Sequence, residues 1–249
     1  MTKIRTASYL FIFLMLAACG SDQTDLSINF KLENDGGPLV FFEDIQYPDG
    51  RSMQMTKVSF YLSQIELVND TKVERLSEVE FVDLTEAQLL ASTAEEGTTI
   101  SYSDIEIEDF GQLRFNVGLT ETQNNTVPGD YNSGDALGMS GEYWTDWNSY
   151  IFIKLEGKLD FDQNGSYDAG ENIVLHLGTS EITNTKSVNI DESQSTVNFV
   201  IDIQDVFNSA EHGLYDIDSK KTLHQLTDEN IEFMTILASN LTEAIKLNN

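Results

Sequence analysis

The chain has 249 residues, of which 42 are Asp or Glu and only 14 are Lys or Arg, so its formal net charge is −28. Such an acidic protein repels the phosphate backbone of nucleic acids, which excludes nucleic-acid binding as its function. A single cysteine also excludes an intramolecular disulfide.

The N-terminal residues have the pattern of an export signal. Lys3 and Arg5 form a short basic region, and the apolar run 7–15 follows it. This run is too short for a lasting membrane span and is typical of the hydrophobic part of a signal peptide. Residues 16–20 (LAACG) come next, and small residues before a cysteine are typical of a bacterial lipobox. We therefore predict a lipoprotein signal peptide over 1–19, with Cys19 as the lipidation site.

Lipidation of Cys19 would anchor the protein to a membrane without spanning it, because the attached acyl chains insert into the bilayer. Gly20 follows the cysteine, where an Asp would commonly retain the lipoprotein at the inner membrane. We therefore expect an outer-membrane lipoprotein that faces the periplasm or the cell surface. Residues 20–25 are predicted to be a tether and 26–249 a folded domain. The alternative is an ordinary secretory peptide that happens to contain a cysteine.

Most of the remaining chain consists of short segments in which apolar and polar residues alternate. This period of two is typical of strands with one buried face, and turn residues separate the segments. The predicted strands cover 26–32, 57–68, 79–84, 112–119, 150–155, 172–177, 181–190 and 196–203. Strands at this spacing predict a mainly β fold, a sandwich or a barrel, and we favour an antiparallel β-sandwich.

Two other segments differ from this pattern. Near the C-terminus, apolar residues recur every three or four positions, at 231, 234, 237, 241 and 245, and Thr227 is a suitable N-cap. These features predict a C-terminal helix of about five turns, and a short helix is also expected over 86–92. Residues 134–147 form a long loop rich in Gly and aromatic residues, and loops of this length are often functional.

Residues 160–171 match the twelve-residue calcium loop, with a glycine at the sixth position for the sharp turn. The predicted ligands are Asp160, Asp162, Asn164, the carbonyl of Ser166, Asp168 through water, and Glu171. These hard oxygen ligands suit calcium over zinc or copper. Because strands are predicted on both sides, we expect calcium to stabilise a hairpin. The alternative is a solvated acidic loop without an ion.

Both tryptophans of the chain, Trp144 and Trp147, come just before the predicted strand 150–155. The run 138–157 that contains them resembles the signature of the MbnP-like copper-binding domain, which is named after a methanobactin-associated periplasmic protein. The resemblance extends to the motifs at 60–67, 115–119 and 175–178, and to a late histidine, His224, that precedes a helix. It covers most of the chain after the signal peptide, in matching order.

The resemblance implies a β-sandwich in a lipoprotein or periplasmic protein that binds copper. In some relatives a partner di-haem enzyme of the MauG type oxidises a tryptophan to kynurenine, which then helps histidines to ligate copper. The matching positions in this chain are Trp144, Trp147, His176 and His224. The resemblance also implies an outer-membrane transporter as a further partner. Two residues separate the tryptophans here, where family members more often have one.

From the residues alone, ordinary structural roles are the alternative for these positions. His176 alternates with Leu175 and Leu177 in a predicted strand, where a histidine is often structural, and both tryptophans could be core aromatics. His212 lies in a predicted surface turn, and we do not expect it to bind metal.

We do not expect an enzyme, because the sequence lacks a Gly-x-Ser-x-Gly motif, a His-Glu-x-x-His motif and a phosphate-binding loop. Two functions remain. The first is an exported lipoprotein that captures or stores copper and carries a calcium-type loop. The alternative is a calcium-stabilised structural or adhesion lipoprotein without a copper function.

Overall fold

The computed structural model describes residues 24–105, 107, 110–191 and 193–248. The predicted signal peptide, Cys19 and most of the predicted tether lie outside these residues. Within the described part of the chain, no helix combines the length and the hydrophobicity that crossing a membrane requires.

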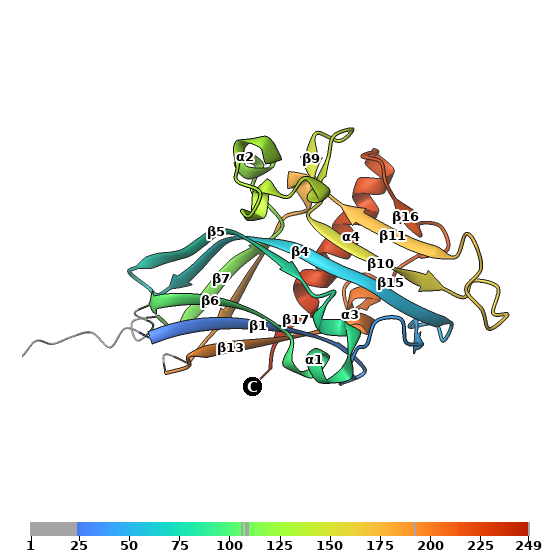
Figure 1. The fold of residues 1–249 in the computed structure, drawn as a ribbon, viewed down its shortest axis with the longest axis horizontal. Helices are drawn as coiled ribbons and strands as arrows, with labels where there is room; N and C mark the ends of the chain where they lie inside the picture. The colour runs from blue at the N-terminus through green and yellow to red at the C-terminus, as the bar shows by residue number, and fades with distance from the viewer. Residues whose placement is uncertain (1–23, 106, 108–109, 192, 249) are drawn as a thin grey trace, which may run out of the picture.

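The prediction of a mainly β fold with a C-terminal helix is confirmed (Figure 1). The first sheet orders its strands as β17 (Ile245–Leu247), β13 (Thr196–Asp202), β1 (Thr24–Asn34) and β2 (Gly37–Pro38), and β6 (Thr98–Ile105) also pairs with β1. The second sheet runs β12 (Asn184–Asn189), β7 (Gln112–Val117), β4 (Ser52–Val68), β10 (Ile153–Leu159), β11 (Asn172–Leu177) and β16 (Thr222–Leu223). Two further strands, β5 (Val73–Asp83) and β3 (Ile45–Gln46), pair with β4.

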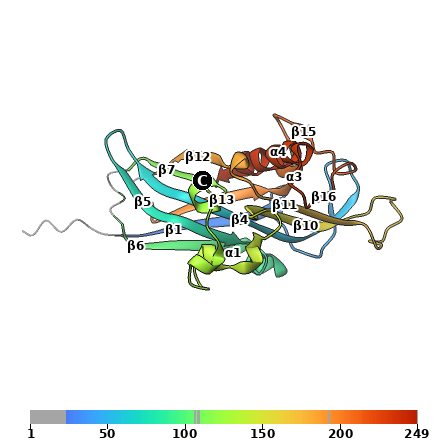
Figure 2. The same ribbon diagram turned by 90° about the horizontal axis from the view of Figure 1, so that it is seen from above.

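Short elements connect and cover the sheets. Two small hairpins are formed by β8 (Tyr143–Trp144) with β9 (Ser149–Tyr150), and by β14 (Asn208–Ser209) with β15 (Gly213–Leu214). The helices are α1 (Ala91–Glu96), α2 (Glu121–Asn124), α3 (Ile203–Phe207) and α4 (Asp228–Ala244). The helix predicted over 86–92 is a 3-10 turn, Ala87–Leu89, followed by α1, because the backbone of Leu90 is extended. Figure 2 shows α4 and α1 on opposite sides of the strand layers.

The sheets are mixed, so the purely antiparallel arrangement that we predicted is wrong in this detail. β1 and β13 are parallel from Ser27 beside Thr196 onward, and β11 and β16 are also parallel. Alternation along a strand reveals which residues are buried, but it is the same for both strand directions. The sequence pattern therefore could not distinguish parallel from antiparallel pairing.

The long strand β4 organises the second sheet. β10 pairs with its first half and β7 with its second half, and both meet it at Tyr61, which hydrogen-bonds Phe152 and Gly118. A β-bulge follows, where Gln64 has a φ of 52°. The extra residue shifts the core-facing apolar positions from 58, 60 and 62 to 65 and 67. One strand can thus serve two neighbours and still keep its apolar face in the core.

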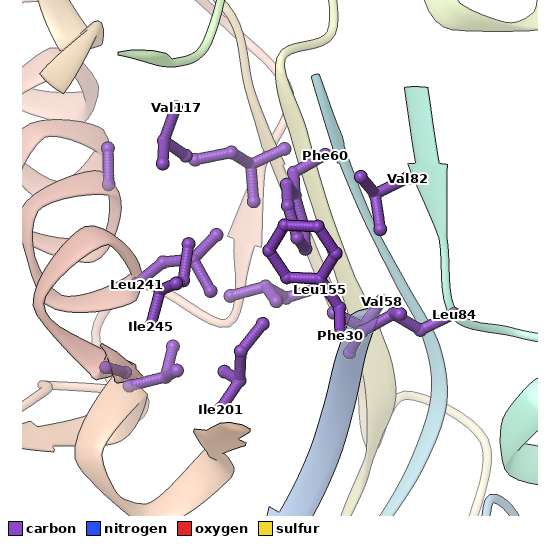
Figure 3. Packing of buried hydrophobic residues seen from close by; sticks show 14 of the residues in the cluster. Phe30, Val58, Phe60, Val82, Leu84, Val117, Leu155, Ile201, Leu241 and Ile245 are labelled. Atoms are coloured by element: carbon purple, nitrogen blue, oxygen red, sulfur yellow. The ribbon is translucent and has the colours of Figure 1, made fainter. Parts of the chain in front are cut away.

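The hydrophobic core lies between the two sheets and α4. Figure 3 shows Leu241 of α4 and Ile245, the first residue of β17, directed towards Ile201 and Leu155 of the two sheets. The predicted N-cap is confirmed, because the Thr227 side chain accepts a hydrogen bond from the backbone N–H of Asn230. Because α4 packs against both sheets, it closes one side of the sandwich. Loops cover the far face of β10 and β11.

Candidate functional site

The pairing of two strands brings His176 and His224 together. β11 and β16 are parallel, with Val174 beside Thr222 and Leu175 beside Leu223. One more step in this register places His176 beside His224, and neighbours in adjacent strands point to the same face. Because the two leucines are buried in the core, both histidines face away from it. Their ring centroids are 4.9 Å apart and their planes differ by 30°.

A tight turn then places the tryptophans over the histidines. The Trp147 backbone N–H donates to the carbonyl of Trp144 at 3.1 Å, so the turn between β8 and β9 brings both indoles to one side. The indole rings are stacked with centroids 5.0 Å apart. The ring of Trp144 lies 5.0 Å from that of His224 and 5.9 Å from that of His176. The structure therefore brings together all four residues that the family resemblance indicated.

Close backbone packing holds the Trp147 indole in place. Trp147 donates its Nε1–H to the carbonyl of His224 at 3.2 Å, which ties the turn to the residue after β16. Gly178 lies beneath: a Cβ atom there would be 2.3 Å from the carbonyl oxygen of Tyr150 and 3.3 Å from the Trp147 ring. A glycine is therefore required where the hairpin crosses the end of β11.

The two imidazoles offer ligand atoms that nothing else uses. His176 Nε2 hydrogen-bonds Glu156 Oε1 at 2.8 Å, and this bond holds the pKa of the Glu156 carboxyl below its ordinary value. His176 Nδ1 and His224 Nε2 are both buried and have no hydrogen-bond partner. Buried polar atoms are normally satisfied, so such atoms require an explanation. Imidazole nitrogens suit copper, so this donor set fits the metal that the family resemblance implies.

An ion pair anchors the covering loop. Lys154 neighbours His176 across the β10–β11 pair, and its Nζ lies 2.8 Å from Glu142 and 2.9 Å from the carbonyl of Gly141. Lys154 and Glu142 are both buried, so the pair fixes the loop against the sheet. Open surface pockets lie on both sides of Trp144, one lined by His176 and the other by His224. Both histidines therefore border open surface, while their two unpartnered nitrogens are themselves buried.

Sequence reasoning missed Glu142, Lys154 and Glu156. The period of two in β10 does place Lys154 and Glu156 on one face, opposite Leu155. Their partners come from other elements, however, and no local pattern names those partners. His212 is placed as expected, in the turn between β14 and β15, with Glu211 at 3.8 Å, outside the cluster of imidazoles and indoles.

The second predicted metal site is the loop between β10 and β11, at one end of the molecule in Figure 1. Carboxylate oxygens of Asp160, Asp162 and Glu171 lie within 4.8 Å of one another. Asp160 accepts from the backbone N–H groups of Asn164 and Gly165, which curls the loop around it. Glu171 accepts from two further backbone N–H groups of the loop, at both of its oxygens.

The remaining predicted ligands lie around these three carboxylates. The Asn164 side chain donates to Asp162 and Asp168 at 3.1 and 3.2 Å, so Asp168 joins through Asn164. Ser166 donates from its backbone N–H and its hydroxyl to the Asn164 side chain. Asp160 and Glu171 are buried, whereas Asp162 is exposed. The loop thus gathers carboxylates, the ligand type that hard cations prefer, and Asn164 hydrogen-bonds to several of them.

Comparison with known proteins gives two matches. The MbnP family model matches residues 23–227. A solved structure, MbnP from Methylosinus trichosporium, is similar with a TM-score of 0.53 and 16% sequence identity, covering 74% of this chain and 78% of that one. At this identity the structural likeness concerns the fold. No curated protein matches the chain. Trp144, Trp147, His176 and His224 all lie within the matched range.

The close approach at Gly178 yields a test. We expect Gly178→Ala to destabilise the protein by about 1–3 kcal/mol, because its Cβ would collide with the Tyr150 carbonyl. The two tryptophans are the only ones in the chain, so near-ultraviolet circular dichroism should also show the loss of their stacking. Gly141→Ala is the control, since nothing lies within 4 Å of its added Cβ. Equal urea midpoints for the two variants would contradict the packing described.

Burial and the neighbouring His176 both hold the pKa of His224 below its ordinary value of 6.5. His224 is therefore neutral in the folded metal-free protein at pH values where the unfolded chain already binds a proton. Its contribution to stability is complete above the unfolded pKa and is lost as the pH falls below it. We expect wild type to lose stability relative to His224→Gln between about pH 7 and pH 5.5. Urea unfolding at several pH values measures this, and a difference independent of pH would contradict it.

Proposed function

The chain belongs to the MbnP family, and from that premise we propose that it is an exported protein that captures or stores copper where His176 and His224 meet. The observation that supports the proposal is the pair of buried, unpartnered imidazole nitrogens on rings 4.9 Å apart. Copper would be held through His176 Nδ1 and His224 Nε2. In the described part of the chain, no third His, Cys, Asp or Glu joins these two nitrogens within the spacing of a metal site.

We further propose that Trp144 completes the donor set after oxidation to kynurenine. An unmodified indole has only an N–H donor and cannot ligate, whereas kynurenine carries an amine and a carbonyl. Trp144 is nearer to both imidazoles, while the Trp147 N–H is already hydrogen-bonded to the His224 carbonyl. A di-haem enzyme of the MauG type would be the oxidising partner and an outer-membrane transporter the receiving one. Both partners follow from the family resemblance.

Lipidation of Cys19 fits the proposed copper function and limits which groups can be copper donors. It would consume the only thiol of the chain and leave imidazole and the modified tryptophan as copper donors. The formal net charge of −28 would concentrate cations around the domain. An outer-membrane lipoprotein that binds metal, rather than an enzyme, agrees with these features.

The three histidines of the chain provide the test of copper binding. We expect His176→Ala and His224→Ala each to weaken binding of Cu(I) or Cu(II) until it is undetectable at micromolar protein. His212→Ala should bind as wild type does, because His212 lies outside the cluster. Titration in competition with a chelator measures the affinities, and mass spectrometry shows whether Trp144 has been oxidised. Equal binding by all three variants, or none by wild type, would refute the proposal.

A second function is favoured by the loop 160–171. We propose that calcium binds Asp160, Asp162, Asn164, the Ser166 carbonyl, Asp168 and Glu171 and stabilises the β10–β11 hairpin. The gathered carboxylates support this, since an ion would offset their repulsion. A calcium-stabilised structural or adhesion lipoprotein without copper is the alternative overall function. It requires the loop to bind calcium and the imidazoles not to bind copper.

Calcium should therefore raise the melting temperature of the wild-type protein, and a chelator should reverse the rise. Asp160→Ala combined with Glu171→Ala removes the two buried carboxylates and should abolish the response. Glu86→Ala combined with Glu95→Ala makes the same change in net charge at two exposed positions. This control variant should keep the rise in melting temperature with calcium. Scanning calorimetry provides the measurement. Identical melting of the wild type with calcium and with chelator would rule the site out.

A further inference from the structure

Glu156 is the acidic residue that hydrogen-bonds the imidazole pair, through His176. It lies on β10, two residues from Lys154, and β10 pairs with β11 so that Glu156 stands beside Val174 and Lys154 beside His176. The diagonal from Glu156 to His176 is short enough for a direct hydrogen bond, His176 Nε2 to Glu156 Oε1 at 2.8 Å. The His176 side chain is 12% exposed and the Glu156 side chain is 33% exposed, so the bond is partly buried.

The cations around Glu156 are engaged elsewhere. Lys57 is its neighbour on β4, and the Lys57 ammonium group lies 3.2 Å from Asp83. Lys154 pairs with Glu142 at 2.8 Å. The short contact of Glu156 is therefore the hydrogen bond with His176. This bond decides which nitrogen of the His176 ring carries the proton.

The hydrogen bond specifies a tautomer. An ionised carboxylate can only accept, so His176 Nε2 must carry the proton in this bond. In the neutral ring the other nitrogen, Nδ1, is then left with a lone pair, and Nδ1 is the buried atom of His176 that has no partner. Histidines that ligate metals commonly donate their second N–H to a carboxylate in this way, which orients the ring and raises its basicity.

We propose that Glu156 is a positioning residue that holds His176 as the Nε2–H tautomer and so assigns Nδ1 as its metal-binding atom. This role of Glu156 rests on the proposed copper function, but its test does not, because the test uses the metal-free protein. Glu156 acts through His176 and is not itself a ligand. Among the described residues, its carboxylate does not form a metal-spaced group of three with the nitrogens of His176 and His224. Without Glu156, His176 could also present Nε2, on the side of the ring away from its buried Nδ1.

The test uses the metal-free protein with 15N-labelled histidine. Long-range proton–nitrogen correlation spectra distinguish the two tautomers, and only three histidines contribute signals. We expect His176 to be the Nε2–H tautomer in wild type. In Glu156→Gln the amide can either accept or donate, so a mixture of tautomers should appear. Glu156→Asp keeps a carboxylate and should retain more of the wild-type tautomer. Glu211→Gln, beside His212, is the control and should leave His176 unchanged.

Copper affinity is the second readout. Glu156→Gln should weaken copper binding by about 10- to 100-fold, and Glu156→Asp by less. The proposal is overturned if wild-type His176 is the Nδ1–H tautomer, or if Glu156→Gln leaves its tautomer unchanged. Failure of the wild-type protein to bind copper would refute the proposed function instead, and the tautomer spectra would still decide the role of Glu156.

Discussion

The parallel pairing of β16 with β11 is the contact on which the imidazole face depends. β16 is only two residues long, but the Val174 N–H donates to the Lys221 carbonyl at 2.8 Å and Leu223 is fully buried, so its register is well defined. A slip of one residue would turn His224 into the core and Leu223 out of it. The burial of one leucine therefore decides whether the two histidines face each other.

The covering loop turns an ordinary outer strand face into a sheltered one. The polar face of a sheet is usually in water, but here Trp144, Trp147 and the Lys154–Glu142 pair lie across it. Tyr61 on the outer face of β4 is likewise buried, against Phe81 and Tyr150, and its hydroxyl donates to the carbonyl of Ala136. Removal from water favours hydrogen bonds between polar groups, such as the Glu156–His176 bond. Burial also lowers the pKa of His224 directly, because it disfavours the charged ring.

The acidic loop and the imidazole face are built on the same strands. Glu171 immediately precedes β11, which carries His176, while Lys221 immediately precedes β16 and its ammonium group donates to the Gly170 carbonyl at 2.5 Å. Lys221 also lies over the ring of Phe161, 4.6 Å from its centroid. The loop thus braces β11, which carries His176, and β16, which His224 follows, in a domain that has no disulfide to stabilise it.

The sequence by itself determined much of the local structure and indicated four residues of the candidate site, Trp144, Trp147, His176 and His224. Alternation identified most long strands, helical spacing identified α4, and the motifs around Trp144 indicated the family. The strand β6 (Thr98–Ile105) was missed because Thr and Ser occupy half of its positions and none of its residues is fully buried. The acidic loop was found because all its predicted ligands lie within twelve consecutive residues.

Only the tertiary structure decided which strands are parallel, where β4 bulges, and that His176 and His224 are neighbours with Glu156 bonded to one of them. The reason is physical. Periodicity reports how each residue faces the core, and that is a local property of the chain. The choice of neighbour is made when distant segments bury their apolar faces together, so it depends on the whole assembled sheet.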